Sequence, residues 1–222
     1  MSVNKQNYQE ILSQLQPGGV TLVAVSKIKP VSDIEALHAL GQKDFGENYV
    51  QELLEKARAA PPGIRWHFIG HLQSNKVKYI APFIHLIHGV DSEKLLKEID
   101  KQGRKNGRAI NCLLQVHIAQ EVTKFGFDAD EVTALISKIT AGESSFEHVN
   151  ICGLMGMASF SDDLQKVRSE FEFLAALYKN LQAAMPSFNT LSMGMSGDYK
   201  LAVECGSTMV RIGSLLFGAR IQ

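Results

Sequence analysis

The sequence has no excess of charge of either sign, because 23 lysines and arginines balance 23 aspartates and glutamates. Proteins that bind nucleic acids or anionic membrane surfaces normally carry a basic excess, so neither is expected as a partner. The chain also lacks an apolar run of the roughly 20 residues that a membrane-spanning helix needs. Its first ten residues, MSVNKQNYQE, are polar, and we therefore expect no signal peptide.

Cysteine is scarce as well. The three cysteines, Cys112, Cys152 and Cys205, are odd in number and far apart. This usage favours free thiols in a reducing cytoplasm over a disulfide framework. Histidines come in two close pairs, 67/71 and 85/88, but the sequence places no supporting cluster of carboxylates or cysteines beside either pair. No metal is therefore expected.

Apolar runs of strand length alternate with helical patterns along the whole chain. The strand-like runs lie at 21–27, 44–48, 64–70, 84–91, 110–119, 148–159, 189–196 and 208–218. The segment 92–107 illustrates the helical pattern, with apolar side chains repeating on one face. Ser32 is the predicted N-cap of the helix that follows the first strand. Residues 1–16 are expected to add a helix ahead of that strand.

Eight alternating units predict a parallel sheet. The strands are continuous apolar runs, as expected when helices cover both faces. Eight units that close on themselves form a (β/α)8 TIM barrel, which typically needs about 250 residues and can be shorter. A doubly wound open sheet is the alternative. No linker or low-complexity tract interrupts residues 1–222, so a single domain is predicted.

The run TLVAVSKIKP, residues 21–30, ends a buried strand in a lysine. Pro30 prevents the strand from continuing as a paired central one. In a barrel, active sites form where strands end, so Lys27 is either a surface residue or an amine placed for chemistry. Desolvation and a nearby positive charge such as Arg211 would lower its pKa and free the amine to attack an aldehyde.

The ends of the last two strands carry small residues. LSMGMSGD places Ser192 and Ser196 around Gly194, and Gly213 follows Arg211 in RIGS. Backbone N–H groups in such loops approach phosphate oxygens closely, which favours a phosphate site over simple turns. Arg211 would add a donor to the phosphate or to a ring nitrogen.

Several stretches together resemble one known family. AVSKIKP, FGENYVQE, WHFIGHLQSNK, GLMGMAS, LSMGMSGD and GSTMVRIGSLLFGAR extend from residue 24 to 220. They are similar to motifs of the pyridoxal phosphate homeostasis proteins, single-domain relatives of the alanine racemase barrel. The resemblance implies a TIM barrel that holds pyridoxal 5'-phosphate (PLP) as an aldimine, a Schiff base, on the lysine at position 27.

The resemblance also assigns cofactor-binding roles to other residues. It places phosphate contacts on Ser192, Ser196, Ile212 and Gly213, and sets Arg211 near the pyridine nitrogen. An arginine there would keep that nitrogen unprotonated and weaken the ring as an electron sink. Asn48 and His67 would line the ring's side of the pocket. No catalytic residue is expected.

The implied function is intracellular PLP homeostasis. The protein would act as a cytoplasmic, monomeric carrier or buffer, with PLP-dependent apo-enzymes as recipients. At 222 residues, the chain is expected to lack the second, β-rich domain of alanine racemase. A PLP-dependent amino-acid racemase or lyase is the alternative, and a barrel that binds a phosphorylated sugar is a third reading.

His71 stands where many family members carry proline, which concerns only the conformation of the loop after the third strand-like run. Lys124 and Gly126 match the family's Lys-x-Gly element, with the bulky Phe125 between them. Lys124 is a second candidate for transient contact with the aldehyde or phosphate.

Overall fold

Each strand of the sheet pairs in parallel with the next strand in the chain, and β8 pairs with β1, so the sheet closes into a barrel. The computed structural model describes residues 3–119 and 125–218. The strands are β1 (Thr21–Val25), β2 (Asp44–Glu47), β3 (Arg65–Phe68), β4 (Leu86–Val90), β5 (Ile110–Gln115), β6 (Val149–Met155), β7 (Thr190–Ser192) and β8 (Met209–Ile212). The predicted TIM barrel is confirmed, and the open sheet is excluded.

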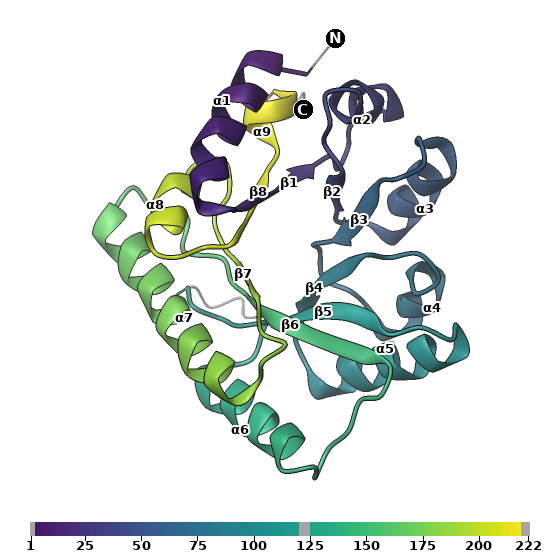
Figure 1. The fold of residues 1–222 in the computed structure, drawn as a ribbon, viewed down its shortest axis with the longest axis vertical. Coiled ribbons are helices and arrows are strands. Elements are labelled where there is room, and N and C mark those ends of the chain that lie inside the picture. Colours follow the sequence, from purple (N-terminus) through teal and green to yellow (C-terminus); the bar gives the residue numbers. More distant parts are fainter. Residues whose placement is uncertain (1–2, 120–124, 219–222) are drawn as a thin grey trace.

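Helices surround the ring of strands (Figure 1). They are α1 (Lys5–Leu15), α2 (Val31–His38), α3 (Val50–Ala59), α4 (Val77–Ile80), α5 (Glu93–Lys105), α6 (Ala129–Thr140), α7 (Leu164–Ala184), α8 (Tyr199–Glu204) and α9 (Ser214–Phe217), with short 3-10 turns at Gln16–Gly18 and Ser74–Lys76. The helix predicted ahead of β1 is confirmed as α1. Among the described residues, no helix combines the length and apolar character needed to cross a membrane.

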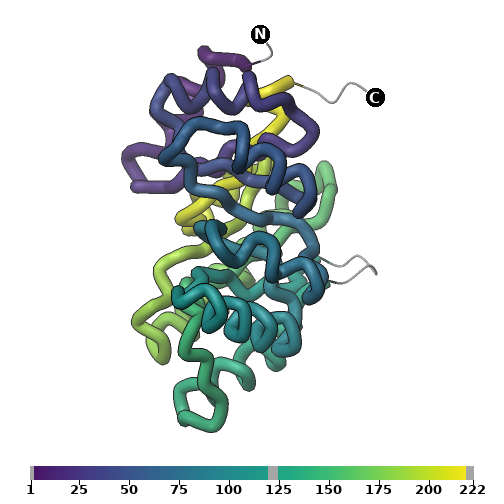
Figure 2. Tube along the Cα trace, turned by 90° about the vertical axis from the view of Figure 1, so that its right-hand side faces the viewer, coloured from purple at the N-terminus to yellow at the C-terminus, as the bar shows by residue number. Residues whose placement is uncertain are grey.

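The first and last described helices pack against each other. The Asn4 N–H donates to the Leu216 carbonyl over 2.8 Å, and α1 lies beside α9 in both views (Figures 1 and 2). The Lys29 ammonium adds a hydrogen bond to the Phe217 carbonyl at 2.8 Å. These contacts hold α9 beside α1 and the loop after β1.

Register shows which side chains face the barrel interior. Val23, Leu86, Leu113, Met155 and Met209 form a separate apolar cluster inside the ring, while the larger core lies between strands and helices. Residues that pair directly with this inner cluster share its face. Arg211 pairs with Val23, His67 with Leu86 and Ser192 with Met209. The interior therefore combines apolar residues with an unusual set of polar ones.

Two local predictions were wrong. Ser32 is not an N-cap, because α2 begins at Val31 with Pro30 in the cap position. The predicted strands also extended too far: β5 ends at Gln115 and β6 at Met155, short of 119 and 159. Beyond β5, the apolar Val116 is buried and pairs in an isolated bridge with Phe127 outside the strand. By contrast, α6, the helix after β5, has a capping box in which Asp128 accepts the Glu131 N–H.

Candidate functional site

Lys27 lies two residues beyond the end of β1, at the mouth of the barrel. Ser26 before it is fully buried, Lys27 is half-buried, and Ile28 after it is exposed. Ile28 has a φ of 64°, which a β-branched residue rarely adopts. The backbone therefore turns sharply at the lysine, and such strain persists only where surrounding contacts hold it.

Three charged side chains from β2 and α3 supply those contacts. The Ile28 N–H donates to Glu52 at 2.5 Å, and Ser26 Oγ donates to Glu47 at 2.6 Å. The Lys56 ammonium binds both carboxylates and the backbone before Lys27. It donates to Glu47 at 2.8 Å, to Glu52 at 2.6 Å and to the Ser26 carbonyl at 2.6 Å. The loop that carries Lys27 is thus fastened on both sides of the lysine.

Glu47 is the member of this group with a raised pKa and a buried carboxylate oxygen that lacks a partner among the described residues. Burial raises the pKa of its carboxyl, and the neighbouring Lys56 and Ser26 only partly oppose that shift. Its Oε1 is bonded, but Oε2 is buried and has no hydrogen-bond partner among the described residues. Removing Lys56 would therefore leave a buried carboxylate without its main compensation.

The loops after β7 and β8 meet at the same end of the barrel. The Gly213 N–H donates to Ser196 Oγ at 3.2 Å, which joins the two loops directly. A Cβ on Gly213 would lie 3.2 Å from the Val25 carbonyl of β1. Gly194 has a φ of 93°, and a Cβ there would lie 2.5 Å from the Ala202 side chain. A larger residue would not fit at Gly194, and at Gly213 it would be tight against Val25.

Arg211 extends into the barrel from β8 and is 4% exposed. Its Nη1 donates to Ser192 Oγ at 2.7 Å, and its Nη2 donates to the Gly156 carbonyl at 3.1 Å. Burial lowers the pKa of the guanidinium to about 10, against the opposing charge of Asp198. Arg211 is therefore a cation at neutral pH. Two of its five N–H donors are assigned by these contacts, and the others can serve a ligand.

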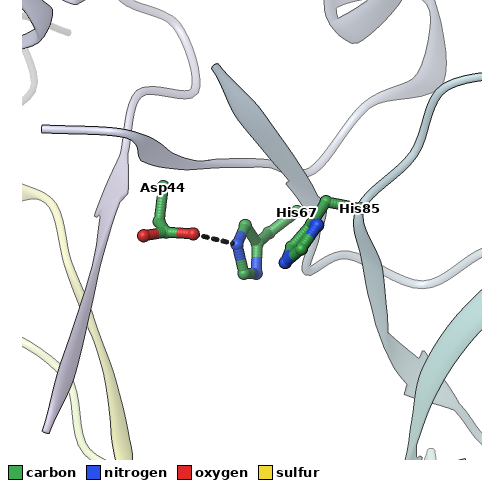
Figure 3. A group of neighbouring side chains, drawn as sticks. All are labelled: Asp44, His67 and His85. Carbon is green, nitrogen blue, oxygen red and sulfur yellow. Dashed lines mark hydrogen bonds and ion pairs between the residues drawn. The ribbon is translucent and has the colours of Figure 1, made fainter. Parts of the chain in front are cut away.

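Ser192 continues a row of buried polar side chains. His88 Nδ1 lies 3.1 Å from Ser192 Oγ, and His88 Nε2 lies 2.9 Å from His67 Nδ1. His67 Nε2 in turn lies 2.9 Å from Asp44 Oδ1, the contact drawn in Figure 3. Arg65 donates its Nε to the same oxygen at 2.7 Å and a second N–H to Oδ2. Both histidines and Ser192 are fully buried.

Asp44 has an unusual electrostatic setting. Burial opposes its ionisation, but the hydrogen bonds from His67 and Arg65, together with the positive charge of Arg65, outweigh burial and hold its pKa below the usual range. His88 shows the opposite case of a buried base. Its pKa lies well below the ordinary value, first because of burial, and the positive charge of Arg211 adds to the shift.

The potential metal-ligand atoms of Asp44, His67 and His85 lie within 4.8 Å of one another (Figure 3). The fold thus brings a carboxylate to two histidines that lack one nearby in sequence. However, Arg65 occupies both oxygens of Asp44, and an ion between Asp44 and His67 would lie beside that guanidinium. The arrangement fits a hydrogen-bond network better than a metal centre.

The other predicted site residues have less direct roles. Asn48 directly follows β2 and is half-buried. The side chain of Ile212 packs in the core between sheet and helices, so only its backbone faces the mouth. His71 is half-exposed and pairs with Asp91 at 3.0 Å. Lys124 lies outside the described residues.

Comparison with known proteins identifies the family. The model of the alanine racemase N-terminal domain matches residues 3–221. A pyridoxal phosphate homeostasis protein of Vibrio alginolyticus is 39% identical, with 99% of each chain covered. The human protein of the same name is 40% identical over 94% of this chain and 78% of its own. The chain belongs to the pyridoxal phosphate homeostasis protein family.

Solved structures of this family agree with the fold. PipY of Synechococcus elongatus without PLP is 34% identical, with a TM-score of 0.89 over 96% of this chain and 99% of its own. PipY with PLP bound is 33% identical, with a TM-score of 0.86 and the same coverage. Alanine racemase of Bartonella henselae, at 18% identity and a TM-score of 0.72, shares the fold, and the match covers 60% of that chain.

Several supporting residues were not predicted from the sequence. Glu47 and Glu52 lie within the FGENYVQE stretch that carries the family resemblance, and Lys56 follows one helical turn after Glu52. The i,i+4 spacing of Glu52 and Lys56 was a usable signal. Asp44 and His88 gave no such signal, because their partners are distant in sequence.

Proposed function

We propose that this chain binds PLP through Lys27 and acts in intracellular PLP homeostasis. The observation that carries the proposal is the position of Lys27, on a braced loop at the mouth of a barrel whose relative PipY has been solved with PLP bound. PLP supplies an aldehyde that condenses with a lysine amine with loss of water. Lys27 provides that amine.

The phosphate end of the ligand would lie on the loops after β7 and β8. Gly194 and Gly213 leave room for close approach of backbone N–H groups, and Ser196 holds the two loops together. Because β8 pairs with β1, this cradle borders the strand that leads to Lys27. Ser196, Gly213 and the backbone of Ile212 are the proposed phosphate contacts. Ser192 was also predicted to contact the phosphate, but its hydroxyl lies within hydrogen-bond distance of His88 and Arg211, and we assign it a role through Arg211 instead.

The ring end would face Arg211. A guanidinium that stays protonated at neutral pH can donate a hydrogen bond to the ring nitrogen but cannot give up its proton readily. Donation of this kind keeps the ring nitrogen unprotonated and limits its use as an electron sink. Ser192 would hold the Arg211 guanidinium in place by accepting its hydrogen bond. His67 would support Ser192 through His88. Asn48 would line the mouth of the barrel.

The proposed role is that of a carrier or buffer without robust turnover. The chain would be a cytoplasmic monomer that releases PLP to PLP-dependent apo-enzymes. The racemase or lyase alternative predicts that the protein exchanges the Cα proton of added amino acids in deuterated water. Retention of that proton in the PLP-loaded protein supports the carrier, whereas exchange supports an enzyme.

A pair of lysine variants tests the binding proposal. Lys27→Ala should abolish the absorption band of lysine-bound PLP between about 300 and 500 nm, because no amine remains at that site. Lys29→Ala is the matched control, since Lys29 is on the same loop but bonds the Phe217 carbonyl. It should keep the band. A band that survives Lys27→Ala would overturn the assignment, and a wild type that stays colourless with PLP would favour the phosphosugar reading.

A further inference from the structure

The polar side chains inside the barrel connect its two ends. Asp44 and Arg65 are the first residues of β2 and β3. Ser192 is the last residue of β7, and Arg211 is the third of four in β8. His67 and His88 fill the space between these pairs, so a continuous chain of hydrogen bonds runs from the bottom of the barrel to its mouth.

The residues at the two ends determine which group donates and which accepts in each of these hydrogen bonds. Arg211 can only donate, so Ser192 Oγ accepts from it. Asp44, which is ionised and held by Arg65, can only accept, so His67 donates from Nε2. If His67 is neutral, its Nδ1 must accept from His88 Nε2. If His88 is also neutral, its Nδ1 must accept the hydroxyl proton of Ser192.

Neutral histidines agree with their surroundings. Arg65 already compensates the Asp44 carboxylate through two contacts, so a charged His67 would add an uncompensated cation to a fully buried position. A charged His88 would be a fully buried cation with Arg211 nearby, and burial together with the charge of Arg211 lowers the pKa of His88. With both rings neutral, every ring nitrogen in the chain has a partner.

We infer that Asp44, His67 and His88 are positioning residues that orient the Ser192 hydroxyl and, through it, the Arg211 guanidinium at the ligand pocket. The Ser192 proton is directed to His88, which leaves its oxygen as an acceptor for Arg211. Aligned hydrogen bonds polarise one another, so the anion at Asp44 strengthens this acceptor. The inference rests on the proposed function only in taking PLP as the ligand that Arg211 faces.

Histidine tautomers provide a test that needs no ligand. Nitrogen-15 NMR of histidine-labelled protein without PLP, near neutral pH, should show His67 and His88 as neutral rings protonated at Nε2. Ser192→Ala removes the donor to His88 Nδ1 and should shift the Nδ1 signal of His88. Rings protonated at Nδ1, a charged ring, or no response to Ser192→Ala would overturn the inference.

A double-mutant cycle tests the connection to the pocket. Asp44→Asn should weaken PLP binding about tenfold in the wild-type background, because the charge that ends the chain is lost. In the Ser192→Ala background it should have little further effect, since the link to Arg211 is already absent. Asp100→Asn is the control, because Asp100 accepts the backbone N–H of His148 and is not part of the hydrogen-bond network that leads to Ser192. It should leave affinity unchanged.

Equal losses from Asp44→Asn in both backgrounds would contradict a role through Ser192 and indicate a purely structural one. If Asp44→Asn fails to fold, Ser192→Ala and the NMR signals of His88 still decide the question. If the wild type binds no PLP, the proposed function fails. The histidine tautomers of the unliganded protein still test the hydrogen-bond network from Asp44 to Ser192.

Discussion

The carboxylate of Glu52 accepts the backbone N–H of Ile28 at 2.5 Å, one residue after the candidate PLP-binding lysine. Ile28 has a φ of 64°, so this contact holds a conformation that the residue would not adopt by itself. Lys56 binds the same Glu52 oxygen and the carbonyl of Ser26. The backbone conformation of the loop that carries Lys27 therefore depends on residues of α3.

Lys56→Met tests this dependence. The change removes the cation from two carboxylates, one of them fully buried, and should lower the free energy of unfolding by about 3–5 kcal/mol. It should also reduce the fraction of protein that carries lysine-bound PLP, because the Lys27 loop is released. Denaturant titration and the absorption spectrum measure the two effects.

Lys97→Met is the matched control for this variant. Lys97 forms an i,i+4 pair with Glu93 on the surface, with both side chains more than a third exposed. Its loss should cost no more than about 0.5 kcal/mol and leave PLP binding intact. Equal losses of stability in the two variants would refute the bracing role of Lys56.

Gly194→Ala tests the loop after β7. The new Cβ would lie 2.5 Å from the Ala202 Cβ and 3.0 Å from the Tyr199 Cα, at a φ of 93°. Loss of about 1–3 kcal/mol of stability is expected, together with weaker PLP binding as the loop shifts. Gly197→Ala is the control, since nothing lies within 4 Å of its Cβ position. If both variants bind PLP as tightly as wild type, Gly194 does not shape the phosphate site.

Acid should destabilise the protein partly through His88. Burial and nearby positive charge place its folded pKa well below the unfolded value of about 6.5. As the pH falls below about 6.5, the unfolded chain takes up a proton that folded His88 does not, so the free energy of unfolding decreases. The contribution of this one group is at most about 1.4 kcal/mol per pH unit.

His88→Gln should therefore reduce the slope of unfolding free energy between about pH 5 and 6.5, whatever its effect on stability at neutral pH. Part of the slope should remain, because burial also lowers the pKa of His85. Denaturant titrations across this range compare the variant with the wild type, and an unchanged slope in His88→Gln would exclude a buried neutral His88.

The fold was predictable because its signals are local. Each strand is an apolar run followed by loop residues, and the order of eight such units predicts closure. The same local logic located Lys27, Arg211 and the loop glycines, since a barrel brings its strand ends together. The exact strand ends were missed because apolar residues continue beyond the strand, as at Val116, which is buried and forms an isolated bridge with Phe127.

The interior chain was not predictable in the same way. His88 and Ser192 are 104 residues apart and meet only through barrel closure and strand register. His67 was identified as a site residue, but its partners Asp44 and His88 were not, because single polar residues in apolar strands have no local pattern. Prediction of such contacts requires knowing which residues share the inner face.

The central claim is that Lys27 forms the bond to PLP. Its most direct test is reduction of the PLP-loaded protein with borohydride, followed by mass spectrometry of its peptides to locate the modified lysine. The account predicts a pyridoxyl group on Lys27, with Lys29 and Lys124 unmodified. Modification at either of those lysines in place of Lys27, or at none, would contradict it.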